Sequence, residues 1–191
     1  MNIIYTHNLN GHLDHFPRLF THIKAISARL SPKPLLLDLG GSCHPAQWHC
    51  EATNGRSALI VLDAMGYDAV NTHGLLTSSS YDKLKDQVLM RLIHDAQPHI
   101  IKNVMLALSP VSSEGVRIPK ICLTPSDKMI IQDDWLYLTT IAGDEIGLVQ
   151  IDGDKISHQT EKIPANTIPD PTISGVVDFV LAEAKHYGDK K

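Results

Sequence analysis

The sequence has little that would direct the chain to nucleic acid or to a membrane. Lys and Arg number 17 against 21 Asp and Glu, the formal net charge is −4, and the only basic cluster is the terminal pair Lys190-Lys191. A chain without a basic patch does not attract phosphate backbones or anionic lipid. No apolar run approaches the roughly 20 residues that a membrane-spanning helix needs. We therefore expect neither a nucleic-acid partner nor a membrane partner.

Cysteine is also scarce. The three residues, Cys43, Cys50 and Cys122, are too few and odd in number for a disulfide framework. Unpaired thiols fit a reducing compartment. At the N-terminus, Met1 leads directly into an apolar strand-like run, without the charged and apolar regions of a signal peptide. These features predict a cytoplasmic protein whose cysteines are thiols.

The pattern of the first hundred residues predicts an α/β fold. The length of 191 residues and the hydrophobic fraction of 43% suit a single domain over residues 1–191. Strand-like runs alternate with helical spacing, which favours a parallel sheet covered by helices. The strands are expected at 2–6, 34–39, 67–71 and 98–108, and the helices at 16–30, 53–66 and 80–94.

The second half is different and rich in short β-like runs. Asp152-Gly153 lies between two of them and is a strong hairpin signal. A last helix is expected from Asp170, as its cap, through His186, with Pro171 at the first helical position. The sequence thus predicts a β-rich second half followed by a C-terminal helix.

Several segments together resemble a known family. They are, in chain order, IIYTHNLNGHLDHFPRL, LLLDLGG, EATNGRSALIVLDAMGYDAVNTHGLL, PHIIKNVML, IAGDEIGLVQIDGDKI and IPDPTISGVVDFVLAEAK. This series resembles the calcineurin-like metallophosphoesterases, in the branch of 5′-nucleotidases and 2′,3′-cyclic phosphodiesterases. The resemblance implies a two-sheet β-sandwich flanked by helices. It also implies an active site at the carboxyl ends of the strands, where two divalent metals activate a hydroxide.

The sequence departs from the family at the metal ligands. By the resemblance, Asn8 and Asn10 stand where the family has Asp and His, and Gly41 stands where it has the bridging Asp. Gly74 and Leu75 stand where it has Asn and His. The late histidine motif is absent between Asn103 and Ala142, either through an internal deletion or because it lies beyond the end of this chain. Two cations without anionic ligands are electrostatically implausible, so we expect no metal here.

Other side chains near these positions are candidates for a residual site. CHPAQWHC contains Cys43, His44, His49 and Cys50, which are zinc-ligand types at a spacing unlike that of known zinc sites. We favour a loop with two thiols and solvated imidazoles, although Cys43 and His49 could share an ion with a first-loop histidine. His7, His12 and His73 could gather on the same rim, or be structural. Asp38, at the end of its strand, is interpreted as a hydrogen-bonding residue or as a vestigial polar site.

These observations leave three hypotheses. The first is a catalytically inactive, degenerate and shortened phosphoesterase-like domain that serves as a binding, regulatory or assembly module, without a cofactor. The alternative is a residual phosphohydrolase that holds a single Zn²⁺ or Mn²⁺ through non-standard His and Cys ligands. The third is a homodimer or the subunit of a protein partner, because loss of part of the sandwich would leave sheet edges or apolar surface to be covered.

Overall fold

The structure is a computed structural model that describes residues 1–112, 115–153 and 155–188. Its elements, in chain order, are β1 (Asn2–Thr6), η1 (Leu13–His15), α1 (Phe16–Ser27), β2 (Leu35–Asp38), α2 (Trp48–Thr53), α3 (Arg56–Ala64), β3 (Ala69–Asn71), α4 (Ser78–Leu84), β4 (Arg91–Ile93), β5 (His99–Ile101), β6 (Val104–Ala107), β7 (Lys120–Ser126), β8 (Ile130–Gln132), β9 (Trp135–Thr139), β10 (Glu145–Asp152), β11 (Lys155–Lys162) and α5 (Pro171–Gly188).

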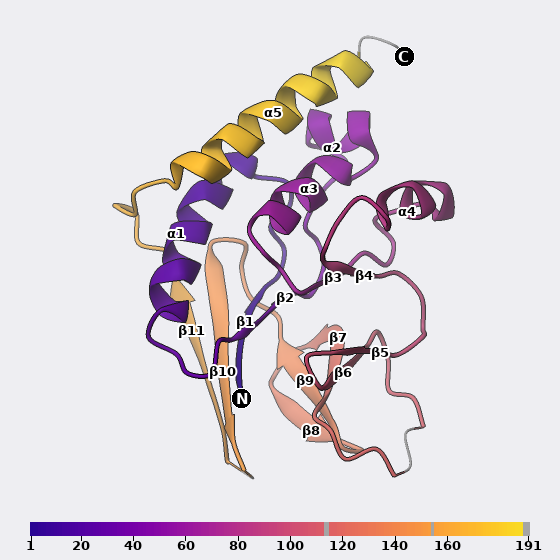
Figure 1. Cartoon of the computed structure of the whole chain (residues 1–191), viewed down its shortest axis with the longest axis vertical. Coiled ribbons are helices and arrows are strands. Elements are labelled where there is room, and N and C mark those ends of the chain that lie inside the picture. Colours follow the sequence, from indigo (N-terminus) through magenta and orange to yellow (C-terminus); the bar gives the residue numbers. More distant parts are fainter. Residues whose placement is uncertain (113–114, 154, 189–191) are drawn as a thin grey trace.

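The strands form two sheets. The first has the order β11-β10-β1-β2-β3-β4, in which β1 to β4 are parallel and the β10–β11 hairpin is antiparallel. The second has the order β5-β6-β7-β9-β8. Figure 1 shows α5 lying across α1, α2 and α3 on one side of the first sheet, with the second sheet on the other side. The expected sandwich of two sheets flanked by helices is confirmed.

The alternation of side chains in β1 shows how the layers are held together. Ile3 and Tyr5 belong to the core between the two sheets, together with Leu37 of β2 and Leu106 of β6. Ile4 points the other way, into the core under the helices. Successive strand residues face opposite sides of a sheet, so a strand between two layers is apolar on both faces, as Ile3, Ile4 and Tyr5 are in the middle of β1. All five residues of β1 are buried.

Two of the predicted helices have different bounds. The helix expected over 53–66 begins only at Arg56, as α3, and a separate helix, α2, precedes it in the segment that was expected to be a loop. Asn54 and Gly55 between the two helices both adopt left-handed backbone (φ 49° and 82°), which ends α2 before α3 begins. The helix expected over 80–94 ends at Leu84. A carboxylate oxygen of Asp63 accepts hydrogen bonds from the backbone N–H groups of Leu89 and Met90, both at 2.8 Å, and the chain then enters β4.

The prediction of a single strand over 98–108 is also wrong. The chain forms the antiparallel hairpin β5–β6, which belongs to the second sheet. Lys102 and Asn103 turn it with φ of 48° and 63°, as two-residue hairpin turns of the primed type require. The Lys102 ammonium pairs with Asp68 at 2.6 Å. The fourth parallel strand of the first sheet is β4 instead.

Two local predictions are confirmed. Asp152 and Lys155 are paired at the end of the β10–β11 hairpin, as the Asp-Gly signal predicted. Asp170 caps α5, because one carboxylate oxygen accepts hydrogen bonds from the N–H groups of Thr172 and Ile173 at 3.0 and 3.1 Å. None of the helices that the structure describes is both long and apolar enough to cross a membrane.

Candidate functional site

The candidate site lies at the carboxyl ends of β1, β2 and β3, where three loops meet. The first two loops, 7–12 and 39–43, continue the pairing of β1 with β2. Backbone hydrogen bonds of 3.0, 2.7 and 2.9 Å run from Asn8, Asn10 and Gly11 to the carbonyl groups of Gly40, Gly41 and Ser42. Because backbone atoms fill the space between these loops, the rim between β1 and β2 is closed.

Asn8 and Asn10 shape the first loop through their backbone conformation. Their φ values are 56° and 52°, in the left-handed region that Asn tolerates better than most other residues. The side-chain amide of Asn8 donates to the carbonyl of Ile141 at 3.3 Å, which links the first loop to the segment after β9. The amide of Asn8 thus holds the loop in place, and neither asparagine offers negative charge to a cation.

Gly41 lies directly against Asn8. Its φ is 69°, and a Cβ atom there would be 3.0 Å from the Oδ1 and 3.1 Å from the Cα of Asn8. A side chain at position 41 would need both strained backbone and a shift of the first loop. By the resemblance, this is the position of the bridging carboxylate, and a side chain here would crowd Asn8.

The third loop, 71–76, contacts the second loop through Asn71, whereas its other side chains have different neighbours. Asn71 donates to the carbonyl of Leu39 at 3.0 Å and accepts from the backbone N–H of His73 at 3.0 Å. The Nδ1 atom of His73 lies 3.3 Å from the carbonyl of His94, after β4. Gly74 has open space around it, whereas Leu75 packs against Gly55 between α2 and α3. No acidic residue occurs in the loops 7–12, 39–43 and 71–76, all of which the structure describes.

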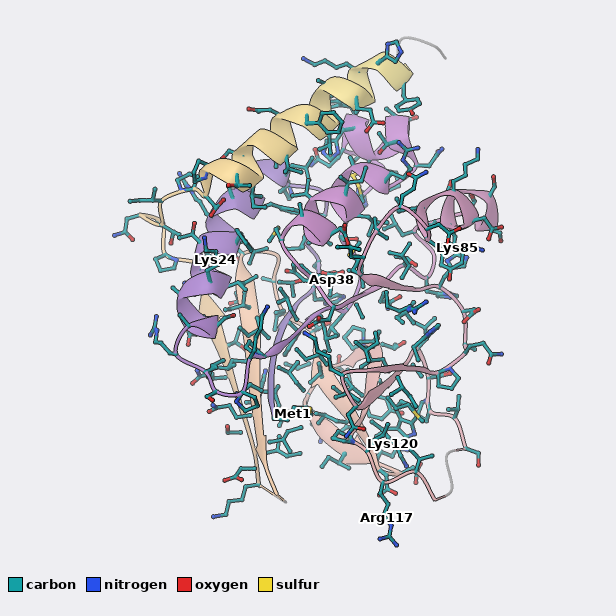
Figure 2. The ribbon with its side chains drawn as sticks, viewed as in Figure 1. Met1, Lys24, Asp38, Lys85, Arg117 and Lys120 are labelled. Atoms are coloured by element: carbon teal, nitrogen blue, oxygen red, sulfur yellow. A yellow bond between two sulfur atoms is a disulfide. The ribbon has the colours of Figure 1, made fainter. Side chains whose placement is uncertain are left out.

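Asp38 is the carboxylate nearest to these loops in sequence, but it faces the interior. Its side chain has no exposed surface, and Figure 2 shows it in the middle of the molecule. It accepts hydrogen bonds from the hydroxyl of Thr6 (2.8 Å) and the N–H of Gly40 (3.0 Å), and the Thr6 hydroxyl also contacts that of Tyr67 (3.0 Å). Burial raises the pKa of Asp38 to about 7, partly opposed by the two hydrogen bonds. Asp38 therefore braces the ends of β1 and β2 from inside.

The first-loop histidines have local partners. The Nδ1 of His7 lies 3.2 Å from the hydroxyl of Thr140, and burial lowers the pKa of His7. His12 stacks on His15, with ring centroids 5.8 Å apart. Within residues 1–112, 115–153 and 155–188, the ligand atoms of His7, His12 and His73 do not converge as a metal site requires.

The Cys43–Cys50 loop corrects a prediction. Cys43 and Cys50 form a disulfide with a Cα–Cα distance of 5.8 Å, so they are not the two thiols that the composition suggested. Cys122 is a free and buried thiol. Two cysteines seven positions apart can be bridged wherever the fold brings their Cα atoms within about 7 Å. The sequence spacing of Cys43 and Cys50 permits this disulfide. The bond forms because α2, which carries Cys50, packs against the loop after β2, which carries Cys43.

The two histidines of this loop differ. His44 is exposed, as expected, whereas His49 is buried and not solvated. Its Nδ1 contacts the hydroxyl of Ser57 at 2.8 Å and its Nε2 contacts the carbonyl of Gly11 at 2.9 Å. Burial lowers the pKa of His49, against the raising effect of the Gly11 carbonyl. Sequence reasoning missed Ser57 and Gly11, because neither has a sequence pattern that links it to His49.

The residues at the expected two-metal position do not fit a metal pair. Amides, glycines and a leucine replace the carboxylates and imidazoles that hold divalent cations. What the rim offers is two small clefts. One, of about 300 Å³, lies beside the first loop and is lined by residues that include Asn10, His12 and Asp144. The other, of about 260 Å³, lies beside the disulfide and is lined by residues that include His44 and Thr77.

Comparisons with known proteins show which known fold the chain resembles. No protein-family model and no curated protein matches the sequence. Two solved structures are similar. The calcineurin-like phosphoesterase YfkN from Bacillus subtilis aligns over 98% of this chain and 98% of its own, with TM-score 0.59 and 10% identity. The sulfate thiohydrolase SoxB from Thermus thermophilus aligns over 93% of this chain, with TM-score 0.65 and 12% identity. The chain spans 48% of that SoxB chain. At these identities the likeness concerns the fold, and the chain has the fold of the calcineurin-like phosphoesterases.

Proposed function

We propose that the chain is a catalytically inactive phosphoesterase-like domain that acts as a binding, regulatory or assembly module. The observation that carries this proposal is the contact between Gly41 and Asn8. A two-metal hydrolase needs an anionic cradle at the carboxyl ends of its strands. At this position the chain has an uncharged glycine in left-handed backbone, so close to Asn8 that a side chain would require the first loop to shift.

The same rim has features that suit binding. The cleft beside the first loop is lined by neutral amides, imidazoles, the carboxylate of Asp144 and the apolar residues Leu9, Phe16 and Leu19. A concave, partly apolar surface with a few polar groups is the usual form of a small-molecule site. A ligand there would be held without being hydrolysed.

Apolar surface at two sheet edges supports the assembly form of the proposal. The strand β4 ends the first sheet and β5 ends the second. Leu89, next to β4, is 99% exposed, and Ile100 of β5 is 64% exposed. Edge strands with exposed apolar residues tend to pair with another chain. Light scattering should therefore show association, which Leu89→Glu weakens; a monomer at high concentration would count against the assembly form.

The test of inactivity is a hydrolysis assay. The purified chain is given bis-p-nitrophenyl phosphate, a 2′,3′-cyclic nucleotide and a 5′-nucleotide, each with added Mn²⁺, Zn²⁺ or Ca²⁺. We expect no turnover above that of the matched buffer. Turnover that a chelator abolishes would overturn the proposal.

The alternative, a residual single-metal phosphohydrolase, is tested in the same assay. It requires bound Zn²⁺ or Mn²⁺ and predicts that His73→Ala abolishes turnover while Asp14→Asn, which changes an exposed residue outside the candidate ligands, does not. The contacts of His73 with the His94 carbonyl and of His7 with Thr140 favour the inactive form.

A cytoplasmic location also remains part of the proposal, and it bears on the disulfide. In a reducing compartment the Cys43–Cys50 bond would be open and the pair present as thiols. Alkylation of the chain in intact cells, followed by mass spectrometry, would show which form is present.

A further inference from the structure

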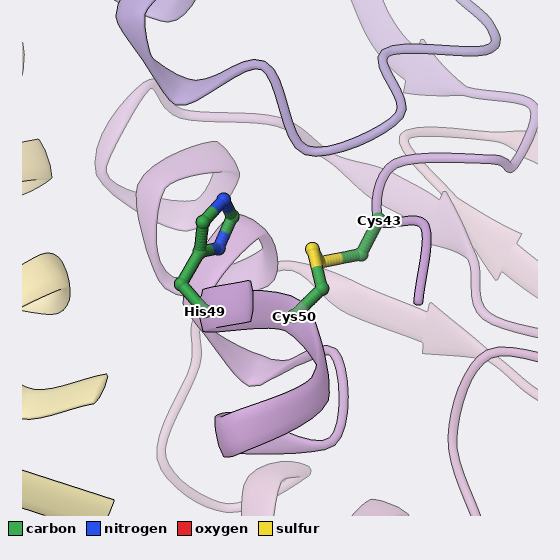
Figure 3. A group of neighbouring side chains, drawn as sticks. All are labelled: Cys43, His49 and Cys50. Atoms are coloured by element: carbon green, nitrogen blue, oxygen red, sulfur yellow. A yellow bond between two sulfur atoms is a disulfide. The ribbon is translucent and has the colours of Figure 1, made fainter. Parts of the chain in front are cut away.

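Cys43, His49 and Cys50 form a compact cluster of metal-ligand types. Their ligand atoms all lie within 4.8 Å of one another, and all three residues are buried. It is the one group of three or more His, Cys, Asp or Glu side chains that converges in this way among residues 1–112, 115–153 and 155–188. Figure 3 shows the imidazole of His49 beside the two sulfur atoms. Cys43 comes from the loop after β2, and the other two residues come from α2.

The oxidised cluster has no thiolate to offer. The two sulfur atoms are bonded to each other, and the ring nitrogens of His49 contact Ser57 and Gly11. A dithiol reductant supplies two electrons and two protons to this bond. The sulfur–sulfur bond breaks, Cys43 and Cys50 become thiols, and the reductant leaves as its own disulfide.

We propose that the reduced chain binds one Zn²⁺-like ion through the thiolates of Cys43 and Cys50 and the imidazole of His49. This ion displaces the two thiol protons to solvent. Cys and His are the ligands that zinc prefers, and Zn–S bonds of about 2.3 Å put two thiolates roughly 3.8 Å apart in a tetrahedron. Once the bond is cut, the sulfurs need to separate by only about 2 Å relative to a disulfide.

The hydrogen bonds of His49 already orient it as a ligand. A carbonyl oxygen only accepts, so the Nε2 that faces the Gly11 carbonyl at 2.9 Å carries the hydrogen and donates it. The lone pair is then on Nδ1. Metal-bound histidines usually have this arrangement, with the second ring nitrogen donating to a carbonyl or carboxylate that fixes the ring.

The position of Ser57 shows on which side of His49 the ion would bind. Its hydroxyl is 2.8 Å from the Nδ1 of His49 and 3.9 Å from the Sγ of Cys43. It therefore lies next to both kinds of ligand atom, where it or a water molecule completes a tetrahedron. When the ion takes the Nδ1 lone pair, the hydroxyl keeps an acceptor in the backbone carbonyl of His49, at 3.5 Å.

This site is separate from the position of the family's metal pair. It lies under Gly11, whose Cα faces the Sγ of Cys50 and the ring of His49, and it uses none of the residues Asn8, Gly41 or Leu75. The inference stands independently of whether the chain hydrolyses phosphoesters.

Cobalt(II) is the probe for the test, because thiolate ligands give it a charge-transfer band in the near ultraviolet and tetrahedral sites give intense visible bands. The full chain is titrated in the oxidised form and, without oxygen, after reduction and removal of the reductant. We expect the reduced chain to develop both bands, to saturate at one ion per chain and to lose them to Zn²⁺. The oxidised chain should show neither band.

Variants identify the ligands. Cys50→Ser should weaken binding and reduce the charge-transfer band, the Cys43→Ser/Cys50→Ser double variant should abolish that band, and His49→Gln should weaken binding and change the visible bands. His44→Ala, on the same loop, and Cys122→Ser, the other cysteine, should bind as the parent does. Circular dichroism shows whether each variant is folded, and the comparison of oxidised with reduced parent needs no variant.

Three outcomes overturn the inference. They are a reduced chain without the bands, oxidised and reduced chains with the same spectrum, and loss of the bands in Cys122→Ser. None of these readouts measures turnover, so this test can fail while the proposed inactivity holds, and the reverse.

Discussion

A Cβ atom on Gly41 would lie 3.0 Å from the Oδ1 of Asn8, so these two residues close the rim between β1 and β2. The contact joins two replacements that the sequence shows separately. A glycine allows the second loop to approach, and an asparagine in left-handed backbone holds the first loop in place. Restoring one carboxylate would therefore disturb the other loop.

The first prediction concerns Gly41→Asp. Left-handed backbone costs a residue with a side chain roughly 1–2 kcal/mol, and the contact with Asn8 adds to this cost. Gly74→Asp is the matched control, since Gly74 has φ 74° but open space around it. Urea unfolding should show a larger loss of stability for Gly41→Asp than for Gly74→Asp, without gain of phosphodiesterase activity. Equal losses would mean that the contact with Asn8 is unimportant.

The second prediction concerns Asp38 and pH. Its pKa is raised from 3.8 to about 7 by burial, so between these values the folded chain binds more protons than the unfolded chain. Stability contributed by the neutral carboxyl is thus fully present below about pH 4 and is lost as the pH rises toward 7. The upper bound of this change is about 4 kcal/mol, at 1.36 kcal/mol per pKa unit.

Asp38→Asn tests this by removing the ionisation. Urea unfolding across this pH range should show the stability of the variant gaining on that of the parent as the pH rises. Asp14→Asn, which changes an exposed carboxylate, serves as the control. A constant difference between parent and Asp38→Asn would show that Asp38 has the same pKa in both states.

The third prediction concerns the disulfide. Cutting a bridge that closes a short loop should lower the free energy of unfolding by about 2–3 kcal/mol, through the entropy of the unfolded chain. Urea unfolding with and without reductant measures this, and added Zn²⁺ should return part of the loss to the reduced chain. The Cys43→Ser/Cys50→Ser double variant should be insensitive to reductant. Reductant-dependent stability in that variant would assign the effect to another bond.

The fourth prediction concerns Gly11→Ala. A Cβ atom there would be 2.6 Å from the Sγ of Cys50 and 3.3 Å from the ring of His49, so the variant should be destabilised beyond the strain of its φ of 75°. Gly66→Ala, with φ 79° and no neighbour within 4 Å, measures the strain alone. Combining Gly11→Ala with Cys50→Ala should reduce its cost without removing it. A cost as small as that of Gly66→Ala would contradict the close approach.

Much of the fold could be predicted from local pattern. The buried runs at β1 and β2 are apolar on both faces, as parallel strands between two layers must be. The cap of α5 at Asp170 and the β10–β11 turn use only neighbouring residues, so the sequence contains their whole cause. The predictions for residues 80–94 and 98–108 failed because distant partners decide them. Asp63 holds the chain before β4, and pairing in the second sheet makes a hairpin at Lys102.

The sequence by itself determined which charges the rim lacks, because a residue's chemistry does not depend on the fold. Asn8, Gly41 and Leu75 are neutral wherever they lie. Only the tertiary structure decided that a side chain on Gly41 would crowd Asn8, that Asp38 is sealed from solvent, and that Cys43 and Cys50 form a bond beside His49. Each of these depends on distances between segments that are far apart along the chain, and such distances are set by how the sheet and helices pack.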